Sequence, residues 1–347
     1  MNWRLNKTLF GLRRWWPWAP QLKPEVIPKG AAPKWHVIVL DGTLSSFERG
    51  RETNAGQLAK LLSKSRPEVY VYYEPGLQFN GWRSVWSLLT GKGIGDQIQR
   101  AFGVLSSRYD PGDKIVLAGY SRGAFAVRSL SGMIDRVGLL KPEHATERMV
   151  ELAWSHYRRL MSEETLQDFR DEYCLTDITI EAVGVWDTVR ALGLPYVNKI
   201  YKDPYAFHSY DIAECVSSGF HAMALNESRL AYNLEKWNAS TRPDKELRQV
   251  WFRGVHGDVG GHLSGFEAAR PLSNIPFIWV VENLEAKGLP CPENWKDRFQ
   301  TDPQAPSLGI WRGWGRFLPI RKRRMVNLKA GEEIHTGVAK EMYLKQL

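Results

Sequence analysis

The segment Gly119-Tyr120-Ser121-Arg122-Gly123 places a serine between two glycines, directly after the apolar run Ile115–Ala118. A serine becomes nucleophilic when a sharp strand-to-helix turn exposes its Oγ beside the N-terminus of the helix, where negative charge is stabilised. Gly119 and Gly123 leave room for the close approach of strand and helix. The pattern predicts Ser121 as the nucleophile of an acyl transfer and the Arg122 N–H as an oxyanion donor. The alternative is an ordinary glycine-containing turn.

Such a serine needs a histidine base and a carboxylate that orients the histidine, in the chain order serine, acid, histidine. Asp187 follows the apolar run Ala182–Trp186, and His256 follows the run Gln249–Val255. Because the carboxyl ends of parallel strands share one edge of a sheet, these side chains are expected to meet there. We therefore predict Asp187 as the acid and His256 as the base. The structural alternatives are a helix cap for Asp187 and a backbone-bonded loop histidine for His256.

Two alternate site residues stay open on this evidence. Asp258 is a second candidate for the acid, and His335 is a second candidate for the base, although no clear strand precedes His335. His256, Asp258 and His262 are not expected to form a metal site, because glycines interrupt them and a third strong ligand set is missing. We expect no metal and no other cofactor.

The first apolar run of the chain ends at Asp41-Gly42-Thr43. In a serine hydrolase this loop is positioned to supply the second oxyanion N–H, from Gly42 or Thr43. Asp41 either fixes the loop or is an ordinary turn aspartate.

The elements that must position these residues alternate between strands and helices. The strands are predicted at Trp35–Leu40, Val69–Tyr73, Lys114–Ala118, Ile178–Trp186 and Arg248–Phe252. The helices are predicted at Asn54–Ser63, Gly95–Tyr109, Gly123–Val137, Pro142–Asp168 and Asn274–Lys287. This alternation predicts an α/β fold with a doubly wound, mostly parallel sheet and helices on both faces.

The chain has 347 residues and a net charge of +9, from 47 basic and 38 acidic residues. Residues 1–33 form a basic leader rich in Trp and Pro, and residues 34–347 form the predicted catalytic domain. A second basic and aromatic segment lies near 311–325 and includes Arg321-Lys322-Arg323-Arg324. Both segments are interpreted as contacts with an anionic membrane surface. The alternative is a disordered or packed tail for the leader and a solvated basic face for Arg321–Arg324. No known nucleic-acid motif accompanies the charge, so nucleic acid is not an expected partner.

The remaining composition bears on location. No run of eighteen apolar residues occurs, and Arg13 and Arg14 interrupt the apolar character of the N-terminus, so neither a membrane-spanning helix nor a signal peptide is predicted. The cysteines are widely spaced and odd in number, which suits a reducing compartment; they are Cys174, Cys215 and Cys291. We expect synthesis in the cytoplasm, followed by membrane association or by export through a signal-independent system. The oligomeric state is not predicted.

Several motifs in order resemble the α/β-hydrolase domain family typified by the type VI secretion phospholipase effectors, over residues of about 34–340. They are Asp41-Gly42-Thr43, Thr53-Asn54, 72–76 (YYEPG), 109–113 (YDPGD), 119–125 (GYSRGAF) with Arg128, 184–189 (GVWDTV), 224–229 (ALNESR) and 254–261 (GVHGDVGG). The resemblance implies an α/β-hydrolase fold and phospholipid hydrolysis in some members. It implies a triad of Ser121, Asp187 and His256. Asn226 and Glu74 stand where the family often has aspartate, and His262 stands where a further glycine is usual.

The residues and the resemblance together predict a lipolytic serine ester hydrolase that acts on phospholipid or another acyl ester through an acyl-enzyme. One alternative is a carboxylesterase of small soluble esters. The other is a catalytically silent protein that binds an anionic surface.

Overall fold

The computed structural model describes residues 33–42, 45, 52–63, 67–76, 92–189, 211–238, 244–311 and 320–344. The predicted leader lies outside these residues except for Pro33, and so do Thr43 and residues 312–319 of the second basic segment. The boundary proposed between leader and domain therefore stays a prediction.

Seven strands of the described residues form one sheet, in the order β2-β1-β3-β6-β7-β8-β9. Every neighbouring pair in this sheet is parallel. The strands are β1 (Trp35–Leu40), β2 (Val69–Glu74), β3 (Lys114–Tyr120), β6 (Ile180–Trp186), β7 (Ser218–Ala224), β8 (Glu246–Phe252) and β9 (Glu332–Ile334). A separate antiparallel pair joins β4 (Leu139–Leu140) to β5 (Cys174–Leu175). Because all seven strands run the same way, their carboxyl ends meet along one edge.

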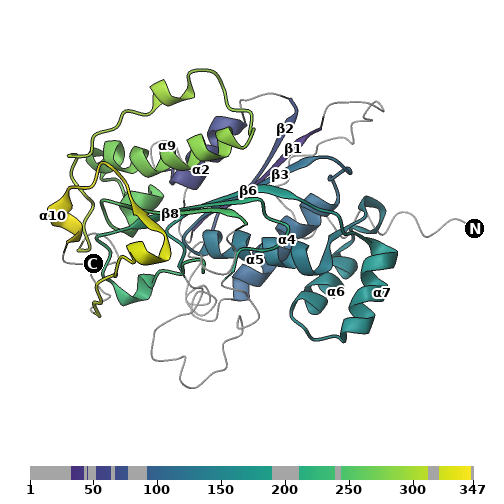
Figure 1. Cartoon of the computed structure of the whole chain (residues 1–347). Coiled ribbons are helices and arrows are strands. Elements are labelled where there is room, and N and C mark those ends of the chain that lie inside the picture. Colours follow the sequence, from purple (N-terminus) through teal and green to yellow (C-terminus); the bar gives the residue numbers. More distant parts are fainter. Residues whose placement is uncertain are drawn as a thin grey trace, which may run out of the picture.

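Helices cover both faces of the sheet (Figure 1). Helices α2 (Asn54–Leu62) and α9 (Arg270–Ala286) lie on one face. The other face carries α4 (Lys92–Ser106), α5 (Arg122–Val137), α6 (Glu147–Tyr157) and α7 (Glu163–Tyr173). Two further helices are short: α8 (His256–Gly260) lies before α9 in the chain, and α10 (Lys340–Tyr343) lies after it. The predicted α/β fold is confirmed.

Alternation along the central strands explains why the sheet is covered on both faces. Ile38 of β1 and Leu117 of β3 pack with α4 and α5, whereas their neighbours Val39 and Val116 pack with α2 and α9. Successive side chains of a strand point to opposite faces of the sheet. A strand with apolar residues on both faces must therefore be covered by helices on both faces. β1 and β3 therefore lie inside the sheet, each between two other strands, and β3 ends directly before Ser121 at the carboxyl edge.

Three sequence expectations about elements need correction. The segment Ser218–Ala224 has no run of β-branched residues, yet all seven residues are buried in β7 between β6 and β8. The predicted helix Pro142–Asp168 is wrong as a single element, because it divides into a short 3₁₀ turn, α6 and α7. Thr146 and Ser162 cap the two α-helices through their side chains. Helix α9 begins at Arg270, four residues before the predicted start.

Candidate active site

Ser121 lies on a tight turn between β3 and α5, with backbone angles of φ 58° and ψ −122°. A non-glycine residue at positive φ is strained, so its neighbours must hold the turn in place. A Cβ on Gly119 would come within 2.6 Å of the Gly123 carbonyl oxygen, and one on Gly123 within 2.1 Å of the Leu40 carbonyl oxygen. The Ser121 N–H also donates to the Trp186 carbonyl at 3.0 Å, which ties the turn to β6. The two glycines are therefore required by close backbone contact.

Alanine at Gly123 is expected to lower the free energy of unfolding by roughly 1–3 kcal/mol or more, because helix α5 must move away from β1. Gly56→Ala in α2 is the matched control, since its nearest new contacts would be ordinary ones at 3.5 Å. In a helix interior that change is expected to stabilise by up to about 1 kcal/mol. Guanidinium denaturation of both variants measures the difference, and equal stabilities would contradict this account of the turn.

The structure brings Ser121, His256 and Asp187 together at the carboxyl edge of the sheet. His256 Nε2 lies 2.9 Å from Ser121 Oγ. Its other ring nitrogen, Nδ1, lies 2.6 Å from Asp187 Oδ2. Ser121 follows β3, Asp187 follows β6 and His256 begins α8 just beyond β8. All three are buried, and Asp187 is completely inaccessible to solvent. These are the hydrogen-bond distances of a nucleophile, base and orienting acid.

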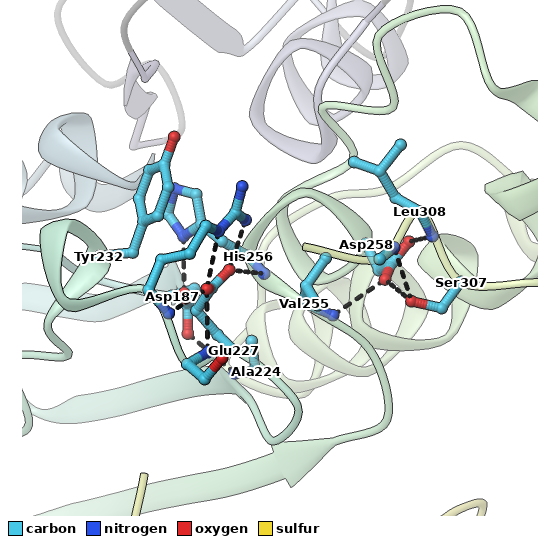
Figure 2. A network of polar contacts seen from close by, with 12 residues as sticks. Asp187, Ala224, Glu227, Tyr232, Val255, His256, Asp258, Ser307 and Leu308 are labelled. Carbon is cyan, nitrogen blue, oxygen red and sulfur yellow. Dashed lines mark hydrogen bonds and ion pairs between the residues drawn. The ribbon is translucent and has the colours of Figure 1, made fainter. Parts of the chain in front are cut away.

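The Asp187 carboxylate accepts hydrogen bonds on both oxygens (Figure 2). Oδ1 accepts the Ala224 N–H at 2.8 Å, and Oδ2 faces His256. The guanidinium of Arg324 also binds this carboxylate, with Nη1 2.6 Å from Oδ1 and Nη2 3.0 Å from Oδ2. The same guanidinium donates to the carbonyls of Ala224 at 2.8 Å and Tyr232 at 2.7 Å. The acid is therefore fixed by a buried ion pair as well as by the base.

Burial alone would raise the pKa of Asp187, but the charge of Arg324 and the hydrogen bond with His256 lower that pKa well below its usual range. Burial lowers the pKa of His256 from its ordinary value of 6.5, and the Asp187 carboxylate opposes this effect without cancelling it. At neutral pH the pair is thus a carboxylate beside a neutral imidazole. This is the protonation state that a general base requires.

The imidazole of His256 contacts two aromatic rings, and a glutamate binds the backbone N–H of the same residue. Its centroid lies 4.5 Å from the ring of Tyr232 and 4.8 Å from that of Tyr120. Glu227 Oε2 accepts the backbone N–H of His256 at 3.2 Å, and Arg229 binds Glu227 through two contacts of 2.8 and 2.5 Å. Arg229 also lies over the Tyr232 ring at 4.4 Å. These contacts restrict the ring to the plane in which it reaches both partners.

The N–H groups that the sequence predicted as oxyanion donors are those of Arg122 and of Gly42 or Thr43, and their environments differ. The Arg122 N–H begins helix α5, and no partner for it occurs among the residues that the structure describes. Gly42 is not available as the second donor, because its N–H donates to Asp41 Oδ1 at 2.7 Å. Thr43 lies outside the described residues. Of the expected donors, the Arg122 N–H at the N-terminus of α5 is the one that the described residues leave available for an oxyanion.

Asp41 fixes the loop that follows β1. Its Oδ2 accepts the hydroxyls of Thr53 at 2.5 Å and Tyr73 at 2.8 Å, while Oδ1 holds the Gly42 N–H. Burial raises the pKa of Asp41 to about 6, against these hydrogen bonds, which lower it. Of the two readings of Asp41, the geometry favours the one in which it organises the loop.

Asp258, the alternate acid, makes contacts of a different kind. Its Oδ2 accepts from the Val255 N–H at 2.9 Å and from the Ser307 hydroxyl at 2.5 Å, and its Oδ1 accepts the Leu308 N–H at 2.7 Å (Figure 2). These bonds fasten residues 307–308 to the turn that carries His256. Asp258 therefore stabilises the turn that carries His256, whereas Asp187 is the carboxylate that contacts the imidazole ring.

His335, the alternate base, lies just beyond β9 at the sheet edge. Its ring stacks on Phe252 with centroids 4.7 Å apart, and its Nδ1 accepts the Gly337 N–H at 3.1 Å. It lines a surface depression between α9 and β9 with a volume of about 390 Å³. The structure therefore places His256, and not His335, within hydrogen-bond distance of Ser121.

Arg324 is a residue of this site that was not predicted from the sequence. Its segment was interpreted as a solvated or membrane-facing basic stretch, and Lys322 and Arg323 are indeed exposed. Arg324 and Val326 are buried instead, whereas Met325 between them is exposed. This alternation is typical of an extended segment with one face on the protein. It is the only local signal in these residues, and it does not identify Asp187 as the partner.

Two comparisons show partial likenesses. The uncharacterized protein YEL023C of Saccharomyces cerevisiae is 29% identical over 188 residues, which is 46% of this chain and 27% of the yeast protein. The crystal structure of an uncharacterized protein from Pseudomonas aeruginosa matches with a TM-score of 0.44 and 16% identity, over 80% of this chain and 52% of that chain. The chain thus spans about a quarter of the yeast relative and about half of the solved protein.

A family model for the catalytic domain of Tle1-like phospholipase effectors of the type VI secretion system matches residues 34–283. The matched range includes Ser121, Asp187 and His256 and ends before Arg324. It covers well over half of the chain. The chain belongs to the family of T6SS phospholipase effector Tle1-like catalytic domains.

Proposed function

We propose that this protein is a serine ester hydrolase that cleaves an acyl ester of phospholipids. The observation that carries the proposal is the continuous chain of hydrogen bonds from Ser121 Oγ through His256 to Asp187, at 2.9 and 2.6 Å. Membership of a phospholipase catalytic-domain family supports the class of substrate.

In the proposed reaction, His256 Nε2 takes the Ser121 proton as Oγ attacks the ester carbonyl carbon. Asp187 keeps Nδ1 protonated and stabilises the imidazolium that forms. The Arg122 N–H and the N-terminus of α5 hold the oxyanion of the tetrahedral intermediate. His256 then gives its proton to the leaving alcohol. A water that His256 deprotonates attacks the acyl-enzyme, and the fatty acid leaves as Ser121 regains its proton.

The side chain of Arg122 supports an anionic substrate. No described acidic side chain pairs with its guanidinium, and it lies close enough to Tyr120 and Tyr232, the rings beside His256, to interact with them electrostatically. Burial lowers the pKa of Arg122 to about 10, so the group stays charged at neutral pH. A partly buried cation that has no counter-ion among the described residues suits a substrate that brings a phosphate to the nucleophile.

Exposed apolar side chains near the second basic segment support a lipid surface as the source of substrate. Trp311 is 69% exposed and Met325 is 58% exposed, and Ile320 is also exposed. Exposed Lys322 lies in the same segment. Tryptophan prefers the membrane interface, and lysine attracts anionic head groups. None of the helices in the described residues is long and apolar enough to cross a membrane.

The proposal is tested with phospholipid vesicles of phosphatidylethanolamine and phosphatidylglycerol, assayed beside p-nitrophenyl butyrate. We expect release of fatty acid from the vesicles by the wild-type protein and none by Ser121→Ala. Turnover confined to the soluble ester would favour a small-ester carboxylesterase. Turnover that Ser121→Ala leaves unchanged would contradict the site itself.

The pH dependence of kcat/KM on the soluble ester follows from His256. Only the neutral imidazole can accept the serine proton, so activity is present above the pKa of His256 and is lost as the pH falls through it. Because burial lowers this pKa, the acid limb is expected to have its midpoint below 6.5. A profile from pH 4.5 to 9 measures it, and a midpoint above 6.5 would contradict the neutral, buried base.

A further inference from the structure

The guanidinium of Arg324 is the only described cation that contacts the Asp187 carboxylate, and it comes from a segment beyond the residues that the family model matches. We propose that Arg324 is a positioning residue of the triad, which holds the Asp187 carboxylate in the orientation that His256 needs. This inference rests on the proposed function for the role of the triad. It also makes the chain beyond residue 283 a structural part of the catalytic machinery.

The hydrogen-bond geometry leaves the carboxylate one orientation. Oδ1 accepts from the Ala224 N–H and from Arg324 Nη1, while Oδ2 accepts from Arg324 Nη2 and faces His256 Nδ1. Two bonds on each oxygen fill the favourable directions of a carboxylate. Rotation of the carboxylate about its Cβ–Cγ bond would break the bonds with Arg324 and His256 together. The pair therefore fixes the plane in which Oδ2 meets the base.

Arg324 is itself anchored on the side away from the acid. Its Nη1 and Nη2 donate to the carbonyls of Ala224 and Tyr232. The planar guanidinium makes these two contacts and the two contacts with Asp187 at the same time. A lysine ammonium is a point charge with no fixed plane. Tyr232 is also the residue whose ring stacks on His256. One guanidinium thus links the acid to the aromatic wall of the base.

The segment that carries Arg324 is fastened along the site. The Lys322 N–H donates to the Ser228 carbonyl at 2.7 Å, and the side chain of Val326 is buried with Met223 and Trp251. Further along, Glu332 Oε2 accepts the Asn327 N–H at 2.8 Å. These attachments place Arg324 over the carboxyl end of β7 before any substrate is present.

The charge of Arg324 also acts on His256. Asp187 and Glu227 raise the pKa of His256, whereas burial and the Arg324 charge lower it. The other titratable or charged groups around this histidine belong to the flanking elements: Tyr120, Arg122, Arg229, Tyr232, Asp258 and His262. Removal of the guanidinium takes away one positive charge, and the negative charge of Asp187 is then no longer balanced by Arg324. The pKa of His256 is then expected to rise.

The test measures the pKa of His256 directly by NMR, from the ¹³Cε1 shifts of labelled histidine, with the resonance assigned by its loss in His256→Ala. This readout needs no substrate. In Arg324→Gln we expect the pKa to rise by about one unit. In Arg324→Lys, which keeps the charge, we expect it to stay near the wild-type value. The exposed Arg298 supplies the control variant Arg298→Gln, for which no change is expected.

Turnover of the soluble ester supplies the second readout. We expect kcat/KM to fall about 100-fold in Arg324→Gln and about tenfold in Arg324→Lys, because misplacement of an orienting group by about 1 Å has effects of this size. An unchanged His256 pKa in folded Arg324→Gln overturns the proposal. If that variant does not fold, Arg324→Lys decides, and wild-type kcat/KM there overturns it. If the wild-type protein shows no ester turnover, the proposed function fails, while the NMR titration still tests the role of Arg324.

Discussion

Replacement of Ser121 by alanine is expected to lower kcat for ester hydrolysis by about a millionfold, because the bond-forming atom is removed and only binding and oxyanion stabilisation remain. The Oγ of Ser121 has His256 Nε2 as its hydrogen-bond partner in the described residues, and Ser121 is 6% exposed. Loss of this one contact is expected to change the free energy of unfolding by no more than about 1.5 kcal/mol. The effect on rate should therefore appear in a folded protein.

The matched control for this variant is Ser129→Ala, at a buried position further along helix α5. Ser129 is buried as well, and its hydroxyl donates to the Phe125 carbonyl at 2.8 Å without contact to the triad. We expect Ser129→Ala to keep its kcat. Single-turnover assays at high enzyme concentration separate the two variants, and a loss of less than about 100-fold in Ser121→Ala would exclude it as the nucleophile.

Asp187→Asn is expected to damage both rate and stability. The neutral amide can donate to His256 Nδ1 and so favour the wrong tautomer, which is expected to lower kcat by about 10⁴-fold. The change also leaves the buried guanidinium of Arg324 without its counter-ion. Loss of one partner of a buried ion pair is expected to lower the free energy of unfolding by about 3–5 kcal/mol.

A double-mutant cycle separates these two effects. Arg324→Gln in the Asp187→Asn background removes the unpaired charge, so the double variant is expected to be more stable than Asp187→Asn alone, although no more active. Asp135→Asn serves as a control, because its Oδ1 accepts the Cys215 N–H at 2.7 Å and no described contact joins Asp135 to Asp187 or Arg324. Denaturation curves and kcat on the soluble ester measure the cycle. Additive losses of stability would contradict a direct pairing of Asp187 with Arg324.

The sequence was sufficient to predict that Ser121, Asp187 and His256 lie together, because each of them follows an apolar strand. Ser121 and Asp187 come directly after β3 and β6, and His256 lies four residues beyond the end of β8. Parallel strands bring such positions to one edge whatever lies between them in the chain. The glycines around Ser121 mark the turn because no larger residue fits there. The fold class follows from the same strand and helix alternation.

The sequence was insufficient where a role depends on distant partners. Arg324 lies 137 positions from Asp187, and its basic neighbours hide the one buried member of the run. Strand β7 was not predicted, because it lacks a run of β-branched residues. It forms a strand because it is buried between β6 and β8. The N–H of Gly42 is occupied by the side chain of the preceding residue, which no spacing rule anticipates.

Covalent labelling of the native protein with a fluorophosphonate, followed by peptide mass spectrometry, is the most direct test of Ser121 as an activated nucleophile. A serine activated by His256 attacks the phosphorus and keeps the adduct, whereas an ordinary serine does not react at a comparable rate. The account predicts a single adduct on Ser121 in the wild-type protein, none in Ser121→Ala, and strongly slowed labelling in His256→Ala. An adduct on another residue, or ester turnover that persists with Ser121 unlabelled, would contradict it.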